Sequence, residues 1–309
     1  MKKKILISFG TRPEAIKLAK LIHQLKKKKN FIVKVCVSGQ HSQMLYQVLE
    51  LYNIKTDYDF KVMKTNQTLN LLSSNILKKI NHVLENFKPD LILVHGDTTA
   101  FISSLAAFQN KIKIGHVEAG LRTKNLNYPY PEEFNRKSIA VVSDINYTPT
   151  KIASLNLIKE NVPKNKIIQT GNTIVDTLKF SYKSLINNKK NLNKIKKKFS
   201  FINFKKKIII VTSHRRENYG SGIINICNAL KQIVKKNNNI EIIFSVHLNP
   251  NISLEVKKRL SNIKNIHLFK PLDYFSFIYL MKLSYLILTD SGGIQEEAPS
   301  FQKPVLVLR

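Results

Sequence analysis

The stretch 290–293, Asp-Ser-Gly-Gly, with Glu296 and Glu297 close behind it, contains residue types that bind phosphorylated sugars. An apolar, β-prone run at 284–289 precedes it and a helical pattern follows, so the glycines fall at a strand-to-helix turn. Glycine lets backbone approach a ligand closely, and the N–H groups of a starting helix attract an anion. Ser291 could cap that helix or bind a phosphate oxygen, and a carboxylate is the usual partner of ribose hydroxyls. The stretch therefore predicts a nucleotide-sugar cradle, although an ordinary βα turn would explain Ser-Gly-Gly alone.

Three carboxylates stand where predicted strands end or helices begin. Asp97 directly follows the apolar run 91–96. Glu118 ends the run 113–118, and Glu132 opens a helical pattern after a proline-rich loop. Ligands of open α/β sheets bind outside the carboxyl ends of the strands, so we expect these side chains around one site. Crowded carboxylates raise one another's pKa, which allows one to hold a proton while another is a base.

Cationic side chains follow two predicted strands. Arg12 and Lys17 come after the run 4–9, and His214 comes with two arginines after the run 206–213. Arginine's planar fork is hard to replace at a phosphate, whereas lysine suffices on a solvated surface. Arg12 and Lys17 could be ordinary surface cations. Their place at the same sheet edge as the other motifs favours contact with a phosphate or substrate.

The elements that position these residues alternate between short apolar strands and helical patterns, with Gly or Asp at strand ends. This alternation is typical of doubly wound parallel sheets. We expect an α/β protein with two Rossmann-like domains facing a cleft: an N-terminal domain at 1–170, an interdomain helix and Lys/Asn-rich linker at 171–204, and a nucleotide-binding domain at 205–309. No GxGxxG motif follows the first strand, so a dinucleotide is not indicated.

Composition narrows the class of protein. A chain of 309 residues, 43% hydrophobic, is long enough for two cores. No apolar run reaches membrane-spanning length and no signal peptide is visible, so we expect no membrane partner. Cys36 and Cys227 lie in apolar patterns, which favours buried thiols in a reducing cytoplasm.

The formal net charge of +31 raises the question of a nucleic-acid partner. Only seven of the 51 cationic residues are arginines, and the lysines are spread along the whole chain. That distribution indicates a solvated basic surface rather than a patch built for nucleic acid. We therefore expect no nucleic-acid partner.

Seven motifs, in this order, resemble the bacterial non-hydrolysing UDP-N-acetylglucosamine 2-epimerases. They are FGTRPEAIK (9–17), HGDTT (95–99), HVEAGLRT (116–123), PEEFNR (131–136), HRRE (214–217), HLNP (247–250) and TDSGGIQEEAPS (289–300). The resemblance implies the glycosyltransferase-B type of fold, a cytoplasmic homodimer, and neither metal nor NAD as cofactor. Its implied substrates are UDP-N-acetylglucosamine and UDP-N-acetylmannosamine, and its implied product serves surface polysaccharide.

The resemblance also implies a role for each residue that matches the family motifs. The catalytic residues would be Asp97, Glu118, Glu132 and His214. The substrate-binding residues would be Arg12, Lys17, Phe277, Ser291, Gly292, Gly293 and Glu297. A region where some members bind a second, activating UDP-N-acetylglucosamine is matched by Gln40, His41, Gln43, Arg215 and His247.

The family reaction eliminates UDP to give 2-acetamidoglucal and re-adds it with the C2 proton delivered to the other face. Family members continue beyond the position of Arg309 with a phosphate-contacting arginine and further helices, so the resemblance implies a second domain truncated at its C-terminus. On that basis we expect residues 1–309 to bind UDP weakly and to epimerise little. Two alternatives stay open: a UDP-sugar glycosyltransferase of the same fold, or a remnant that only binds UDP.

Overall fold

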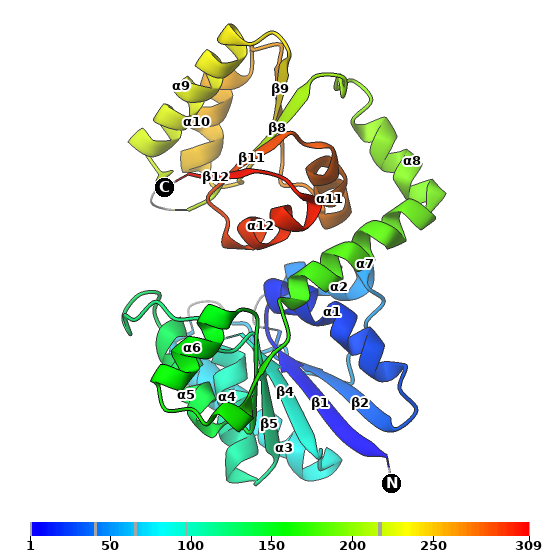
Figure 1. Cartoon of the computed structure of the whole chain (residues 1–309), viewed down its shortest axis with the longest axis vertical. Helices are drawn as coiled ribbons and strands as arrows, with labels where there is room; N and C mark the ends of the chain where they lie inside the picture. Colours follow the sequence, from blue (N-terminus) through cyan, green and yellow to red (C-terminus); the bar gives the residue numbers. More distant parts are fainter. Residues whose placement is uncertain (1, 40–41, 65–66, 97, 216–217, 309) are drawn as a thin grey trace. The chain divides into compact units, whose positions relative to one another are not determined.

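The computed structural model describes residues 2–39, 42–64, 67–96, 98–215 and 218–308, with backbone alone at 42–44. The chain divides into two compact units, Met1–Thr177 and Leu178–Arg309. Each unit is built on a parallel sheet (Figure 1). The predicted α/β class with two Rossmann-like sheets is confirmed.

The first unit alternates strands and helices along its whole length. Its elements are β1 (Lys3–Phe9), α1 (Arg12–Lys26), β2 (Phe31–Val37), α2 (Ser42–Leu51), β3 (Tyr58–Asp59), α3 (Leu69–Phe87), β4 (Leu91–His95), α4 (Thr98–Gln109), β5 (Lys113–Val117), α5 (Glu132–Val142), β6 (Ile145–Thr148), α6 (Lys151–Lys159), the 3₁₀ turn Lys164–Lys166 and β7 (Ile167–Gln169). Across the described residues the strand order is β3-β2-β1-β4-β5-β6-β7, all parallel. The order reverses between β1 and β4, so a crevice opens outside their carboxyl ends.

Apolar runs explain why these strands lie in the middle of the unit. β1 is buried from Ile5 onward, because both faces of a doubly wound sheet are covered by helices. On one face of the sheet, Ile76 and Ile80 of α3 and Ala106 of α4 pack in one core cluster with Ile92 of β4. The core therefore holds the carboxyl ends of β1, β4 and β5 rigidly, and these are the ends that carry the predicted site residues.

The second unit has the same plan with fewer strands. The helix α7 (Thr173–Asn187) leads into it across the division. Its other elements are α8 (Lys189–Lys198), β8 (Lys207–Ser213), α9 (Ser221–Lys236), β9 (Ile240–Val246), α10 (Pro250–Leu260), β10 (Ile266–Phe269), α11 (Tyr274–Leu283), β11 (Leu286–Thr289), α12 (Gly292–Glu297), the 3₁₀ turn Ala298–Phe301 and β12 (Val305–Val307). Its described strands run in the order β10-β9-β8-β11-β12, all parallel, and the order reverses between β8 and β11.

The Lys/Asn-rich stretch that composition suggests as part of a linker forms the helix α8 instead. Its lysines face solvent, but Ile195 is buried. Phe199, directly after the helix, is also buried and meets Phe269 edge to face with ring centroids 5.3 Å apart. Ile195 and Phe199 are four residues apart and lie on one side of the helix, so together they pack that side of α8 against the second unit. In the part of the chain that the structure describes, no helix is long and apolar enough to cross a membrane.

Gly96, after β4, has a backbone conformation that the site requires. Its φ is +100°, and a Cβ there would collide with the Glu14 carboxylate. Glu14 is buried at the start of α1, where it accepts hydrogen bonds from the backbone N–H groups of Gly10 and Thr11. This is one half of a capping box, which fixes the start of α1 against the turn after β4. Glycine at position 96 thus lets two loops of the crevice pack together.

We expect Gly96→Ala to lower the free energy of unfolding more than Gly171→Ala does. Both glycines have positive φ, but a Cβ at Gly171 meets nothing within 4 Å. Gly171→Ala should therefore cost only backbone strain, about 1–2 kcal/mol. Gly96→Ala adds overpacking against Glu14, about 1–3 kcal/mol more. Urea denaturation of the two variants measures the difference, and equal losses would show that the contact with Glu14 does not matter.

Candidate active site

The loops after β1, β4 and β5 surround a cavity of about 340 Å³ in the first unit. It lies at the carboxyl edge of the sheet, where the strand order reverses. Its lining residues are Thr11, Pro13, Glu14, Lys17, Leu69, His95, Gly96, Thr98, His116, Val117, Glu118, Pro131, Glu132 and Arg136. The cavity therefore brings together Lys17, Glu118 and Glu132 from three predicted motifs, as their placement at strand ends indicated.

Lys17 and Glu118 form an ion pair at the side of this cavity, through Nζ and Oε1. Each side chain is only 13% exposed, so solvent screens the pair weakly. Removing either member of such a partly buried pair would leave the other charge poorly compensated. Glu118 has φ of +65°, which a residue other than glycine rarely adopts. Such strain is concentrated at functional sites, where the surrounding structure enforces it.

Two buried histidines, His95 and His116, line the same cavity as Glu118. Burial lowers the pKa of His95 well below 6.5, and the charges of Lys17 and Arg136 lower it further. Burial likewise lowers the pKa of His116 to about 3. Both rings are therefore neutral at neutral pH. Nε2 of His95 lies 3.3 Å from Oε2 of Glu118, so a neutral ring contacts the carboxylate oxygen that Lys17 leaves open.

The adjacent residues Glu132 and Glu133 have different surroundings. Glu133 is fully buried, and its two oxygens accept hydrogen bonds of 3.0 Å from the backbone N–H groups of Thr123 and Lys124. Glu132 lines the cavity, and its Oε2 is buried without a hydrogen-bond partner among the described residues. Glu133 thus anchors the loop before α5, whereas Glu132 keeps an oxygen for a proton or a ligand. Arg136, one turn further along α5, lines the same cavity.

Other predicted residues of the first unit can be placed less fully. Asp97 lies outside the described residues, as do Gln40 and His41, and only the backbone of Gln43 is described, in α2. Arg12 is the first residue of α1, between two residues that line the cavity. His95, His116 and Arg136 were not singled out from the sequence. Their signal was a polar residue inside an otherwise apolar strand, or one helical turn after a predicted acid.

In the second unit, His214 and Asp290 follow β8 and β11, the strands on either side of the reversal. Asp290 was not predicted as a site residue, yet it is completely buried beside His214. The backbone N–H of Arg215 also donates to it, over 2.9 Å. The rings of His214 and His247 have centroids 6.2 Å apart. His214, Arg215 and His247 therefore lie together at one edge of the second sheet.

The Ser-Gly-Gly turn stays open, as a cradle requires. The backbone N–H of Ser291 donates to Oγ1 of Thr289 over 2.9 Å, which ties the turn to the strand end. Gly292 and Gly293 are exposed, and within the described structure a Cβ on either would meet nothing closer than 3.9 Å. Packing within the chain thus gives no reason for glycine at either position.

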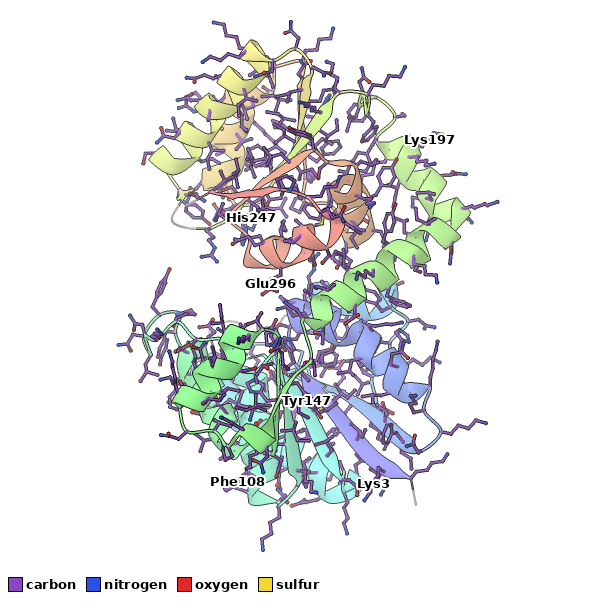
Figure 2. All side chains as sticks on the ribbon, in the orientation of Figure 1. Lys3, Phe108, Tyr147, Lys197, His247 and Glu296 are labelled. Atoms are coloured by element: carbon purple, nitrogen blue, oxygen red, sulfur yellow. The ribbon has the colours of Figure 1, made fainter. Side chains whose placement is uncertain are left out.

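Glu297 lies on α12 behind that turn and is held by Tyr274, whose hydroxyl donates to Oε1 over 3.0 Å. Both side chains are buried, as is Phe277, one turn after Tyr274 on α11. Figure 2 shows the neighbouring Glu296 on α12 and His247 after β9, both in the second unit. Among the residues that the structure describes, no three His, Cys, Asp or Glu side chains are grouped to hold a metal ion.

The comparisons with known proteins agree with one another. The profile of the UDP-N-acetylglucosamine 2-epimerase family matches residues 23–309. A UDP-N-acetylglucosamine 2-epimerase of Campylobacter jejuni is 52% identical over 314 residues, which is 100% of this chain and 82% of the relative. The structure of the Neisseria meningitidis enzyme bound to UDP-GlcNAc superposes with a TM-score of 0.90 at 48% identity, over 99% of this chain and 82% of that one. The Methanocaldococcus jannaschii enzyme, in complex with UDP-GlcNAc and UDP, gives 0.80 at 33% identity, over 99% and 84%.

We expect Glu133→Gln to lower the free energy of unfolding much more than Glu132→Gln does. In Glu133→Gln the amide group must face one of two backbone N–H donors, which loses a charge-assisted hydrogen bond worth about 1.5–3 kcal/mol. Glu132→Gln removes no such bond and should change the free energy of unfolding by less than about 0.5 kcal/mol. Chemical denaturation measures both. If Glu132→Gln were the more destabilising, Glu132 would be a structural residue.

Proposed function

This chain belongs to the UDP-N-acetylglucosamine 2-epimerase family, and from that premise we propose that it interconverts UDP-N-acetylglucosamine and UDP-N-acetylmannosamine by eliminating and re-adding UDP. The observation that carries the proposal is the pair of cavity carboxylates in unlike surroundings. Glu118 has Lys17 as counter-ion, and Glu132 has a buried oxygen without a partner among the described residues. A reaction that removes a proton from one face and returns it to the other needs two such groups.

The chemistry follows from the weak acidity of the C2 proton, which is not adjacent to a ketone. The C1–O bond breaks first and leaves its electron pair on the diphosphate oxygen, so C1 becomes cation-like and the C2 proton becomes removable. A carboxylate takes that proton, and the C1=C2 bond of 2-acetamidoglucal forms. Re-addition reverses both steps, with the proton arriving on the opposite face of C2 and the diphosphate oxygen reclaiming C1.

We assign the base to Glu118 and the proton donor for the opposite face to Glu132, and we keep Asp97 as the third acid of the site. Glu118 is assigned the base because it lines the cavity and has Lys17 as its ion-pair partner. Glu132 is assigned the proton donor because it lines the same cavity and its buried Oε2 has no hydrogen-bond partner among the described residues. The neutral ring of His95 beside Glu118 can hydrogen-bond the carboxylate without competing for the proton.

The second unit is proposed to hold UDP. The open amides of Gly292 and Gly293, with Ser291, would receive the diphosphate, and His214 would meet its charge. Glu297, held by Tyr274, would accept from the ribose hydroxyls, and Phe277 would lie near the uracil. Arg12 and Lys17 of the first unit stay proposed substrate contacts.

A second, activating sugar nucleotide is proposed at Arg215 and His247 together with Gln40, His41 and Gln43. Of these, Arg215 and His247 lie at the same sheet edge as His214, so an anion bound there would sense the charge at the diphosphate. We place the enzyme in the cytoplasm, where its unpaired, buried thiols Cys36 and Cys227 would stay reduced. Its product would supply N-acetylmannosamine units for surface polysaccharide.

The epimerase proposal predicts that UDP-N-acetylmannosamine signals appear in the proton NMR spectrum of UDP-N-acetylglucosamine with the protein, without any acceptor. Glu118→Gln, Glu132→Gln and Asp97→Asn should each lower turnover by about 10²–10⁴-fold, the usual loss of a general acid or base. Glu85→Gln, the same change on the exposed face of α3, should not. Release of UDP only when an acceptor sugar is added would indicate a glycosyltransferase instead.

We also propose that the protein is a homodimer formed through α4 and α5. These helices pack together, and Phe134 of α5 meets Phe101 of α4 with ring centroids 5.6 Å apart. They nevertheless expose large apolar side chains, including Phe108 at 58% and Val141 at 80%. Phe108 is labelled in Figure 2. Exposed apolar surface on adjacent helices is a common feature of subunit interfaces.

Sedimentation equilibrium should therefore give twice the chain mass for the wild type. Val141→Glu should give the monomer mass, because a charge on α5 would be buried without a partner. Leu254→Glu, on α10 and exposed to 66%, is the matched control and should stay dimeric. A monomeric wild type, or a dimeric Val141→Glu, would remove α4 and α5 from the interface.

A further inference from the structure

Asp290 is the most completely surrounded carboxylate at the edge of the second sheet. Its exposed fraction is 0%, and it directly follows β11. Its Oδ2 accepts from four groups: the Ser213 hydroxyl at 3.0 Å and, at 2.9 Å each, the backbone N–H groups of His214 and Arg215 and the Asn218 side-chain amide. No role in the reaction has been given to Asp290 above, although a buried charge needs a reason.

The other oxygen of Asp290 has a single neighbour. Oδ1 lies 2.9 Å from Nδ1 of His214, within the range of an ion pair, and has no hydrogen-bond donor elsewhere among the described residues. Burial acts to raise the pKa of Asp290, but the hydrogen bonds from His214, the backbone of 214–215 and Asn218 hold it well below the usual range. Asp290 is therefore a fixed anion that can only accept.

We propose that Asp290 is the positioning residue of His214: it holds the proton on Nδ1 and so presents Nε2 to the diphosphate. The identity of the atom that carries the proton follows from the contact, since an anion at Nδ1 requires a hydrogen there. The His214 side chain is 45% exposed, so its other edge is open to a ligand. The effect of Asp290 on turnover depends on the proposed function being right. The contact between Asp290 and His214 does not depend on it.

This arrangement gives His214 a charge partner on each side during the reaction. When the C1–O bond breaks, the electron pair stays on the diphosphate oxygen, and the imidazolium donates its Nε2–H to that oxygen. His214 keeps its Nδ1–H beside Asp290 throughout the reaction, so the ring loses no proton from that side. The same aspartate–histidine logic operates in hydrolases, where the aspartate sets the tautomer and stabilises the imidazolium.

The substitution Asp290→Asn separates positioning from packing, because the four donors decide how the amide must turn. The amide oxygen has to take the place of Oδ2 to satisfy Ser213, Asn218 and the two backbone N–H groups. The NH₂ group then takes the place of Oδ1 and can only donate. Nδ1 of His214 must become the acceptor, so the proton moves to Nε2.

The test reads the tautomer directly, in two-bond ¹H–¹⁵N spectra of the histidine-labelled protein at a pH where the ring is neutral. His214→Gln identifies the His214 signals. The wild type should show the Nδ1–H tautomer and Asp290→Asn the Nε2–H tautomer. In the same variant kcat should fall about 10²–10⁴-fold, the range seen when such a pair adopts the wrong tautomer. The Kd of UDP by calorimetry should change only a few-fold, since Nε2–H still donates.

Glu255→Gln is the matched control. It makes the same change of charge in the same unit, on the half-exposed ion pair with Arg259 of α10, and should alter neither the tautomer nor kcat. If the wild type shows Nε2–H, the proposal is wrong even when Asp290→Asn cannot be prepared folded. An unchanged tautomer or an unchanged kcat in Asp290→Asn also overturns it. A tautomer switch in a protein that never epimerises would uphold the contact and contradict the proposed function instead.

Discussion

A carboxylate can be buried only where cations or hydrogen-bond donors replace the water that it loses. This requirement explains the contacts at the carboxyl edges of both sheets. Glu14 accepts from backbone N–H groups at the start of α1, and Glu133 anchors the loop before α5 in the same way. Asp290 gathers donors from β8 and the loop after it, and Glu118 has the Lys17 ammonium. Each of these carboxylates has hydrogen-bond donors or a cation in place of water, and each ties down the loop that supplies them.

Glu132 differs from these four carboxylates, because one of its oxygens is buried without a hydrogen-bond partner among the described residues. The contrast with Glu133, the next residue, shows how one turn of helix gives two acids different tasks. The acid whose oxygens are both satisfied holds the site together, whereas the acid with an open oxygen can exchange a proton. The strained backbone of Glu118 belongs to the same picture, because the packed ends of β4 and β5 keep it where relaxation would move it.

The sequence alone predicted the sheets, their strands and the motifs at the strand ends, because apolar runs bounded by glycine and acidic residues have few other interpretations. It did not predict α8, since ten polar-rich residues conceal the single buried Ile195. It also missed Asp290, although the Thr-Asp-Ser-Gly-Gly stretch was singled out. The importance of Asp290 lies in its contact with His214, 76 positions earlier, and that contact exists only because β8 and β11 are neighbours. The spacing of residues along the chain does not indicate this contact.

The central claim is that the carboxylates of the first unit take the C2 proton and return it from solvent-exchanged groups. It is tested most directly by incubating UDP-N-acetylglucosamine with the protein in D₂O and following C2 by proton NMR. The C2 proton signal should disappear from both sugar nucleotides as they interconvert, because an acid that has exchanged with solvent delivers deuterium. Interconversion with the original proton retained at C2, or UDP release with no label at C2, would contradict it.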